Sequence, residues 1–431
     1  MHEETLIATL TAAFVLALVL GFLATRLRLP PLVGYLCAGV AIGPFTPGYV
    51  ADSGLAAQLA EIGVILLMFG VGLHFSIRDL LAVRRIALPG AIVQIVVATA
   101  IGAATAYGWG WSLGAAIVFG LSLSVASTVV LLRALEQRAA VQSPEGRIAV
   151  GWLIVEDLIT VLALVFLPVL AEVLGPDSGG SATHASAHSV LVSLLLTVAK
   201  VGLFIVLALV VGTRAIPWFL TRIVRTGSRE LFTLSVLAVA LGVAYGSAML
   251  FGVSFALGAF FAGVILSESE LGHRAGTDSV PLQDTFAVLF FVSVGMLFDP
   301  TILVRQPLAV LAVLAIIMVG KSLAAFLIVI AFRHPVGTAL TVSASLAQIG
   351  EFSFVLAGLG VALGLLPRAG QDLILAGALL SITLNPLAFA AARAIGAAWA
   401  SRSRQHPVRA PVTGVSATTP PGAPTSSRPA E

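Results

Sequence analysis

Charged side chains are scarce in this sequence. Asp, Glu, Lys and Arg make up 10% of its 431 residues and hydrophobic residues make up 59%, whereas a soluble domain carries roughly 25% charged residues. The mean hydropathy of +1.07 reflects the same imbalance. This composition excludes a soluble globular domain. It predicts an all-α membrane protein that crosses the lipid bilayer several times.

Cysteine and the common catalytic motifs are also lacking. The single cysteine, Cys37, lies in an apolar segment, so the sequence offers neither a disulfide framework nor a cysteine-based metal site. It contains no phosphate-binding glycine motif, hydrolase nucleophile elbow or zinc-ligand spacing in a plausible soluble context. We therefore expect a protein that is not an enzyme, with no cofactor, no nucleic-acid partner and no metal other than a transported monovalent cation.

Apolar runs separated by polar, Pro or Gly breaks predict thirteen membrane spans. They lie at approximately 5–24, 30–45, 55–74, 86–107, 112–133, 147–171, 189–211, 230–249, 251–267, 281–298, 307–332, 336–364 and 371–396. We expect a transmembrane domain over residues 1–400. The polar, Pro-rich residues 401–431 are expected to form a disordered cytoplasmic tail.

The basic residues indicate how the spans are oriented. Of the 23 Lys and Arg residues, 19 fall in loops on one side or in the tail, Arg305 and Arg368 fall on the other side, and Lys200 and Lys321 lie within spans. Cytoplasmic loops carry the excess of basic residues. We therefore expect the N-terminus and the loop at 172–189 to be outside, and the C-terminus to be cytoplasmic.

Three short motifs recur along the chain. The pairs are GYLCAGV from Gly34 and GAFFAGV from Gly258, EIGVILLMFGVGLHF from Glu61 and DTFAVLFFVSVGMLF from Asp284, and SLSVAS from Ser122 and SASLAQ from Ser343. Their offsets are 224, 223 and 221 residues, so spans 2, 3 and 5 correspond to spans 9, 10 and 12. A shift of seven spans reverses direction. The pattern predicts an inverted-topology repeat of spans 1–6 and 8–13, with span 7 as linker.

The third motif pair is unusually rich in Ser and Gln for helices that contact lipid. We interpret both copies as crossed discontinuous helices, because carbonyl and hydroxyl oxygens of an unwound segment can replace the water around a cation. Ser124, Ser127 and Thr128 are the candidate neutral oxygen ligands. The alternative is that these small polar residues only let helices pack closely.

Two adjacent acids interrupt the apolar run from Ile148 to Leu170, within GWLIVEDLIT. At mid-membrane one acidic group costs about 2.5 kcal/mol or more, and such groups mark ion or proton paths. Glu156 and Asp157 are therefore the candidate ion- and proton-binding residues, with Asp157 as the principal carboxylate. The alternative is a neutralised carboxyl pair with a structural role alone.

Four further polar groups lie deep in predicted spans. Lys321 is too deep to reach either surface, and we expect it to pair with the acidic site, at Asp157 or Glu156, and to compete there with the cation. Glu351, Glu61 and Gln348 are candidates for a proton relay or for the pathway lining. The two acids can equally pair with a basic residue at a domain boundary.

Six motifs together resemble one known family. They are LPPLVGYLCAGVAIGPFTPG, FGVGLHFSIRDLLAVRRIALPG, GWLIVEDLITVLALVFLP, ALGAFFAGVILSES, LFFVSVGMLFDP and SLAQIGEFSFVLAGLG. Over roughly residues 5–396 the sequence is similar to the membrane domain of the Kef-type cation:proton antiporters, in their YbaL/RosB-like branch. The resemblance implies a thirteen-helix, sodium/proton-exchanger-like transporter with a scaffold or dimerisation domain and a six-helix core domain.

The resemblance also assigns roles to residues. An essential Asp of the family matches Asp157, and a core-domain lysine matches Lys321. The residue before the Asp is Asp in electrogenic sodium exchangers, Asn in electroneutral exchangers and Gln in glutathione-gated potassium systems, and here it is Glu156. The family commonly ends in a cytoplasmic nucleotide-binding regulatory domain. We expect this chain to lack that domain and its gating.

The residues and the resemblance together predict a secondary active transporter. It would exchange a monovalent cation, K⁺ first and Na⁺ second, for protons across the bacterial inner membrane by alternating access. The expected partners are the cation, protons, the lipid bilayer and a second copy in a homodimer. The rival hypothesis is a gated monovalent cation channel that uses the same acids and Ser oxygens as a selectivity lining. We favour a carrier because a fixed charge at Lys321 would obstruct cation flow.

Overall fold

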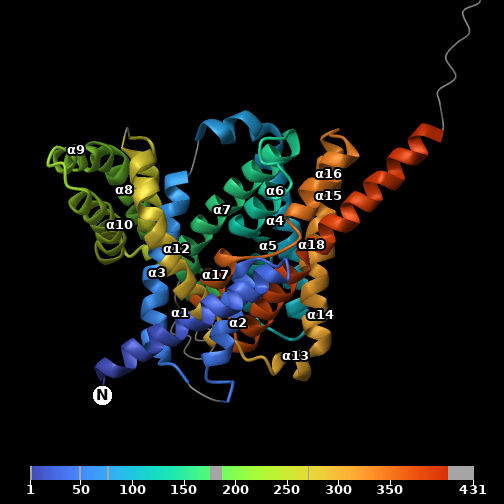
Figure 1. Ribbon diagram of the computed structural model, residues 1–431, viewed down its shortest axis with the longest axis horizontal. Coiled ribbons are helices and arrows are strands. Elements are labelled where there is room, and N and C mark those ends of the chain that lie inside the picture. Colours follow the sequence, from blue (N-terminus) through green and yellow to red (C-terminus); the bar gives the residue numbers. More distant parts are fainter. Residues whose placement is uncertain (1, 48–49, 75–76, 175–186, 270, 406–431) are drawn as a thin grey trace, which may run out of the picture.

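The computed structural model describes residues 2–47, 50–74, 77–174, 187–269 and 271–405. Within these ranges every regular element is a helix (Figure 1). The predicted all-α class is therefore confirmed. Most of the predicted outer loop at 172–189, and the predicted tail from 406 onward, lie outside the described residues.

The described residues form the following helices, in chain order. The first half of the chain forms α1 (His2–Arg26), α2 (Pro31–Ile42), α3 (Ser53–His74), α4 (Ile77–Gly108), α5 (Leu113–Ser124), α6 (Thr128–Glu136), α7 (Pro144–Leu174), α8 (Ala187–Leu207) and α9 (Thr213–Val224). The second half forms α10 (Arg229–Phe251), α11 (Phe255–Ser267), α12 (Gly272–Met296), α13 (Ile302–Arg305), α14 (Pro307–Ala315), α15 (Ser322–Ala331), α16 (Val336–Ser345), α17 (Glu351–Ala362) and α18 (Arg368–Gln405). Two π-helical segments, η2 (Ala208–Gly212) and η3 (Ile316–Lys321), join α8 to α9 and α14 to α15.

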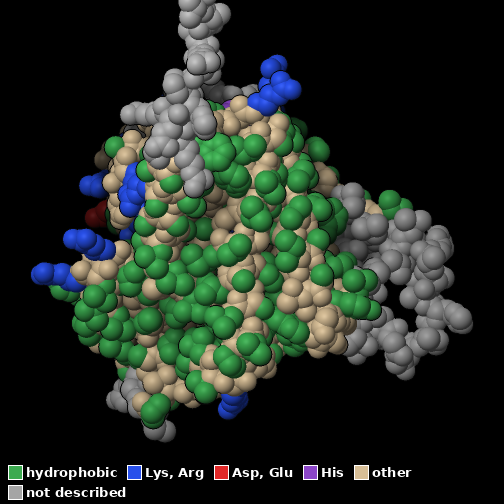
Figure 2. Space-filling view, turned by 90° about the vertical axis from the view of Figure 1, so that its right-hand side faces the viewer, with side chains coloured by type: hydrophobic (Ala, Val, Ile, Leu, Met, Phe, Trp, Pro, Cys, Tyr) green, Lys and Arg blue, Asp and Glu red, His purple; other side chains and the backbone are tan. Residues whose placement is uncertain are grey.

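Ten helices in the described ranges are long and apolar enough to cross a membrane, and four shorter apolar helices accompany them. The chain is therefore a multi-pass membrane protein. Hydrophobic side chains cover most of the face seen in Figure 2, and most Lys and Arg side chains on that face lie in its upper half. Exposed apolar side chains such as Leu250 and Leu308 suit contact with lipid hydrocarbon.

The helices pack as two groups, with α8–α10 at the left of Figure 1 and α14–α16 and α18 at its right. The scaffold group contains α1–α3 and α10–α12, in which α3 packs against α11 and α12, and α2 packs against α1 and α12. The core group contains α4–α7 and α14–α18, in which α4 packs against α5 and α7, and α16 packs against α7, α15 and α18. Helix α9 packs on α10 and α11, at the side of the scaffold group away from the core group.

Glycines bring the scaffold helices into backbone contact at two crossings. A Cβ added to Gly39 on α2 would lie 2.8 Å from the Cα of Gly295 on α12. A Cβ added to Gly72 on α3 would lie 3.0 Å from the Cα of Gly263 on α11. Small residues are what such close crossings require. The recurring motifs align Gly39 with Gly263 and Gly295 with Gly72, so the alignment maps one crossing onto the other.

Two spans are interrupted at the motifs where the sequence predicted unwinding. Helix α5 ends at Ser124 and α6 begins at Thr128. Helix α16 ends at Ser345 and α17 begins at Glu351. Each break frees backbone N–H and C=O groups that a continuous helix would pair internally. The prediction of discontinuous helices is confirmed at both motifs.

The two breaks contact each other inside the core group. A Cβ added to Gly350, just before α17, would lie 2.2 Å from the Cβ of Ser127, so glycine is required for this close approach. Ser127 begins the second half-helix as its N-cap, and its hydroxyl oxygen accepts a hydrogen bond from the Val130 N–H at 3.3 Å. The N-cap at Ser127 and the lack of a side chain at Gly350 therefore allow the two breaks to lie in contact.

Some helices run further than the predicted spans. The predicted seventh span at 189–211 continues through α9 to Val224, because Arg214 remains in the helix and donates to the Val210 carbonyl at 2.9 Å. Helix α18 passes the predicted end at 396 and reaches Gln405, since the sequence has no proline after Pro386 until position 407. Lys200, predicted inside the seventh span, is exposed on the surface of α8.

Candidate ion-binding site

Glu156 and Asp157 lie on α7 beside the break between α5 and α6, and both side chains are buried. The Ala126 N–H donates to Glu156 Oε2 at 2.7 Å. The Thr128 hydroxyl donates to Asp157 Oδ2 at 3.1 Å. The unwound segment and its flank therefore supply one donor to each acid. In a continuous helix the Ala126 N–H would be paired with a carbonyl four residues earlier.

Glu351 brings a third buried carboxylate to the same place from the second break. It is the first residue of α17, and its Oε2 accepts a hydrogen bond from the Ser127 hydroxyl at 2.8 Å. A carboxylate suits this position because the N–H groups of a helix N-terminus carry partial positive charge. The charges of Glu351 and Glu156 both act on Asp157. Asp157 therefore interacts electrostatically with both of the other acids.

Ser127 and Gln348 join the two breaks directly. The Ser127 N–H donates to Gln348 Oε1 at 2.9 Å, and Gln348 Nε2 donates to the Ser127 carbonyl at 3.1 Å. Both residues are buried. The Gln348 amide therefore replaces the backbone partner that the Ser127 N–H loses where the helix is interrupted. It is also a second donor to the Ser127 carbonyl, which already accepts from the Leu131 N–H at 3.1 Å.

Lys321 is fully buried beside this group. It ends the π-helical segment η3, and its Nζ donates to the Gln348 carbonyl at 3.0 Å. Its acidic neighbour is Glu156, with which it interacts electrostatically. The ion pairs within 4.0 Å that occur in the described ranges lie elsewhere. Of the two acids that the sequence offered as partners for Lys321, the structure therefore places Glu156 as the interacting one.

Each of the three carboxylates keeps one buried oxygen that has no hydrogen-bond partner among the described residues. These oxygens are Glu156 Oε1, Asp157 Oδ1 and Glu351 Oε1. A buried ionised oxygen without a partner is costly, and a proton or a cation removes that cost. Three ionised carboxylates against the single ammonium of Lys321 would also leave an excess of negative charge. A bound proton or cation would offset that excess.

Neutral oxygens would complete the coordination of a cation here. The described part of the chain contains no group of three or more His, Cys, Asp or Glu side chains that could hold a metal ion. A monovalent cation at Asp157 would thus combine carboxylate oxygen with the Thr128 hydroxyl and with backbone carbonyls freed at the breaks. This is the chemistry that the unwound segments make available.

The side chains of two residues predicted from the sequence do not join this cluster. The Ser124 hydroxyl donates to the Leu121 carbonyl of its own helix at 2.7 Å, so its side chain caps α5. Glu61 lies on α3 in the scaffold group and its side chain is exposed. The structure brings the other predicted residues together: Glu156, Asp157, Ser127, Thr128, Lys321, Glu351 and Gln348.

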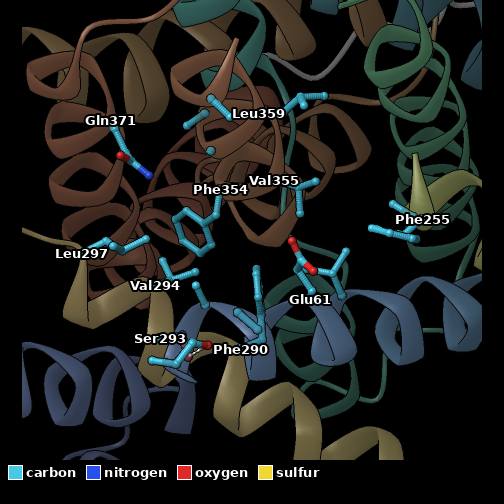
Figure 3. A pocket seen from close by; sticks show the side chains of 18 of the residues that line it. Glu61, Phe255, Phe290, Ser293, Val294, Leu297, Phe354, Val355, Leu359 and Gln371 are labelled. Carbon is cyan, nitrogen blue, oxygen red and sulfur yellow. Dashed lines mark hydrogen bonds between the residues drawn. The ribbon is translucent and has the colours of Figure 1, made fainter. Parts of the chain in front are cut away.

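A cavity of about 410 Å³ lies between the scaffold and core groups, and Glu61 lines it (Figure 3). Its other walls are mainly apolar and include Phe290 of α12 and Phe354 of α17. Figure 3 shows the Glu61 carboxylate directed into the cavity, on the side of Val355. Phe354 follows Glu351 by three residues, about one helical turn. The inner wall of the cavity therefore adjoins the acidic cluster.

Three buried residues at the breaks were missed by the sequence reasoning, which followed charged groups. Gln94 Nε2 on α4 donates to the Ser124 carbonyl at 3.0 Å, and Trp152 Nε1 on α7 donates to Gln94 Oε1 at 3.2 Å. Asn385 Nδ2 on α18 donates to the Ala344 carbonyl at 3.0 Å. The signal for the two amides was their isolation in apolar runs, VQIVV and ITLNPLA.

Two interrupted helices that contact each other within a membrane bundle, with buried carboxylates beside them, are typical of secondary transporters. The chain matches the family model described as "Sodium/hydrogen exchanger, transmembrane" over residues 12–392. The chain therefore belongs to this family, whose members are transporters rather than enzymes.

Its relatives agree with that assignment. The chain is 64% identical over 391 residues to YbaL of Escherichia coli (strain K12), whose name places it among cation/proton antiporters; the match covers 90% of this chain and 69% of YbaL. It is 35% identical over 362 residues to K(+) efflux antiporter 4 of Arabidopsis thaliana, covering 84% and 59% of the two chains. The resemblance to Kef-type cation:proton antiporters is confirmed.

A solved structure has the same fold. The sodium proton antiporter MjNhaP1 from Methanocaldococcus jannaschii, determined at pH 8, superposes with a TM-score of 0.69 and 18% sequence identity. The match covers 91% of this chain and 99% of that one. At this identity the likeness establishes the fold alone.

Proposed function

We propose that this chain exchanges a monovalent cation for protons across the bacterial inner membrane, as a secondary active transporter. The observation that carries the proposal is the set of three buried carboxylates, each with one oxygen held at a helix break and one oxygen without a partner. Such an oxygen binds either a proton or a cation. The names of the relatives support an exchange of these two species.

Asp157 is the carboxylate for which proton and cation compete in this proposal. Thr128 holds Oδ2, while the buried Oδ1 is the oxygen that takes up one species or the other. On the side with more protons, protonation of Asp157 weakens the attraction for the cation and releases it. On the other side, loss of the proton restores the charge and the cation returns.

Lys321 supplies a competing positive charge. When the site holds neither ion, its ammonium offsets the charge of Glu156. When a cation enters, the two positive charges repel, so Lys321 lowers the affinity and prevents trapping. A buried ammonium beside the ion path also disfavours the alternative of a gated channel, because it obstructs continuous cation flow.

An inverted-topology repeat with thirteen spans is part of the proposal. Counting α5–α6, α8–α9, α14–α15 and α16–α17 as one span each, and leaving aside the short α13, gives that number. The N-terminus lies at the lower edge of Figure 1 and α18 ends at the upper edge, as an odd number of spans requires. The two glycine crossings, which the motif alignment maps onto each other, also support the repeat.

Movement of the core group against the scaffold group would supply alternating access. The cavity between the groups supports this step, because it offers a vestibule that ends about one helical turn from Glu351. Glu61 gives the vestibule its negative charge. In the orientation that the basic loops predict, with the N-terminus outside and the C-terminus cytoplasmic, this cavity opens outward.

K⁺ is the first candidate for the transported ion, because relatives are named K(+) efflux antiporters. Na⁺ is the second, because the family model is that of sodium/hydrogen exchangers. A homodimer in the lipid bilayer completes the proposal, on the strength of the resemblance to a family with a dimerisation domain.

The test is transport by purified protein in proteoliposomes with an imposed pH gradient, followed with a pH-sensitive dye. We expect K⁺ or Na⁺ to dissipate the gradient through the wild type and not through Asp157→Asn. Asp284→Asn is the matched control, since Asp284 is exposed on α12. A wild type that exchanges no monovalent cation for protons overturns the proposal, and exchange by Asp157→Asn removes Asp157 from it. Cation flux without proton movement would indicate the channel.

A further inference from the structure

We infer that Gln94 is a positioning residue of the ion site. It holds the carbonyl at the end of α5 and thereby orients the unwound segment that supplies donors to the acids. The inference rests on the proposed function, and it concerns a side chain to which neither the family resemblance nor the relatives' names assign a role. The side-chain hydrogen bonds of Gln94 within the described residues go to the Ser124 carbonyl and to Trp152, so its influence on the acids acts through these partners.

The hydrogen bonds of Gln94 fix the direction of its amide. Its Nε2 donates to the Ser124 carbonyl at 3.0 Å, and its Oε1 accepts from Trp152 Nε1 at 3.2 Å. The indole N–H can only donate and a backbone carbonyl can only accept, so the reversed amide would leave both bonds unmade. Gln94, Trp152 and the end of α5 are all buried.

The same helix that carries the acid pair also orients Gln94. Trp152 and Glu156 are four residues apart on α7, and residues at that spacing share one face of a helix. Trp152 holds Gln94, which holds the Ser124 carbonyl, while Glu156 accepts the Ala126 N–H directly. The start of the unwound segment is thus fastened to α7 at two points.

At the second break, a buried lysine takes the place that Gln94 has at the first. Lys321 Nζ donates to the Gln348 carbonyl as Gln94 Nε2 donates to the Ser124 carbonyl. In the proposed repeat, the span of Gln94 corresponds to the span of Lys321. Each break therefore has a buried side-chain donor from a neighbouring span. An amide at position 94 does this without placing a second positive charge near Glu156.

Loss of the Gln94 donor should therefore displace the site rather than simply weaken the fold. The freed Ser124 carbonyl is buried and would draw the segment away from its present course. The donors that follow in the chain, Ala126 N–H and the Thr128 hydroxyl, would then be misplaced relative to Glu156 and Asp157. Displacements of about 1 Å at a reacting site lower rates up to on the order of a hundredfold.

The experiment compares Gln94→Leu with Gln283→Leu. Gln283 on α12 is also a buried glutamine, and its amide donates to the Ser279 hydroxyl at 2.7 Å, within the scaffold group. Both variants lose a buried hydrogen bond and should melt at lower temperature. We expect only Gln94→Leu to raise the apparent KM for the cation, by about tenfold, and to move the pH profile of exchange to higher pH, because donors to the ionised acids are lost.

A second readout does not depend on transport. Hydrogen–deuterium exchange of the backbone over 121–131 should rise in Gln94→Leu and stay at the wild-type level in Gln283→Leu. Trp152→Phe, which keeps an aromatic side chain but removes the indole N–H, should shift both readouts in the same direction by less. Equal KM, pH profile and backbone exchange in Gln94→Leu and Gln283→Leu would overturn the inference. If the wild type did not exchange cations for protons, but Gln94→Leu still raised hydrogen–deuterium exchange over 121–131, the proposed function alone would be overturned.

Discussion

Ser127 and Gln348 hydrogen-bond each other twice, through the N–H and the carbonyl of one and the side-chain amide of the other, at 2.9 and 3.1 Å. They are 221 residues apart, which equals the offset between the motifs SLSVAS and SASLAQ. A residue contacts its own symmetry counterpart only close to the symmetry axis. If the repeat holds, its axis therefore passes through this contact, and the acids of the site are grouped around it.

Replacing Gln348 by Leu should destabilise the protein and abolish exchange. The substitution leaves the buried N–H of Ser127 without a partner, and such an unsatisfied group costs about 1–3 kcal/mol. The Ser127 carbonyl loses the Gln348 amide but keeps the Leu131 N–H as a donor at 3.1 Å. The melting temperature of the purified protein measures this loss. Gln137→Leu is the control, because Gln137 is exposed at the end of α6. An unchanged melting temperature for Gln348→Leu would show that the contact contributes little.

The sequence predicted the general architecture because long apolar runs and the placement of arginines are determined by the bilayer itself. It located both helix breaks through their Ser and Gln content. It did not predict that η2 and α9 extend the seventh span, because an arginine such as Arg214 usually marks a span end. In the structure, Arg214 bonds to a carbonyl of its own helix and the helix continues.

Most of the site was also predictable, because an acid or a lysine at membrane depth is conspicuous. The roles of individual atoms were not. Ser124 was a candidate for a hydroxyl ligand, yet its hydroxyl bonds within α5 and its carbonyl is the group held by Gln94. Gln94 and Trp152 drew no attention because neither is charged and neither lies in a recurring motif, and their three-dimensional contact with the break shows their role. Spacing along the chain carries no information about such contacts between distant spans.

Lys321→Gln should change the pH dependence of exchange, if Lys321 competes with the cation. The variant removes a positive charge that acts on Glu156, so apparent cation affinity should rise and the pH profile should move. A purely structural lysine predicts a lower melting temperature with an unmoved profile. Measuring both in one preparation separates the two roles.

Two variants sharpen the test of Lys321. Lys200→Gln is the matched control, because Lys200 is exposed on α8, and it should leave both quantities unchanged. In the double variant Lys321→Gln with Glu156→Gln, the effect on the pH profile should be smaller than the sum of the single effects, since the charges act on each other. Additive effects would separate Lys321 from Glu156.

Gly39→Ala should destabilise the scaffold group. The new Cβ would lie 2.8 Å from the Cα of Gly295, and overpacking of this kind costs about 1–3 kcal/mol. Gly242→Ala is the control, since no atom lies within 4 Å of a Cβ at that helical position on α10. The melting temperature should fall for Gly39→Ala and hold or rise for Gly242→Ala. A similar fall in Gly72→Ala would match the proposed equivalence of the two crossings.

Glu61→Gln should lower the apparent affinity for the cation from one side of the membrane only. Glu61 is exposed in a largely apolar cavity, so its charge attracts cations toward the cluster without binding them in a dehydrated form. We expect apparent KM to rise roughly threefold at low ionic strength, and the difference to shrink as added salt screens the charge.

Vesicles with the protein in one orientation reveal the side on which Glu61 acts. With the N-terminus outside, the effect of Glu61→Gln should appear when the cation is supplied from the outer face and vanish when it is supplied from the cytoplasmic face. Glu136→Gln, which removes an exposed acid at the end of α6, is the control and should not raise KM from the outer face. An equal rise from both faces would place Glu61 in the binding site itself. A rise from the cytoplasmic face alone would reverse the proposed orientation.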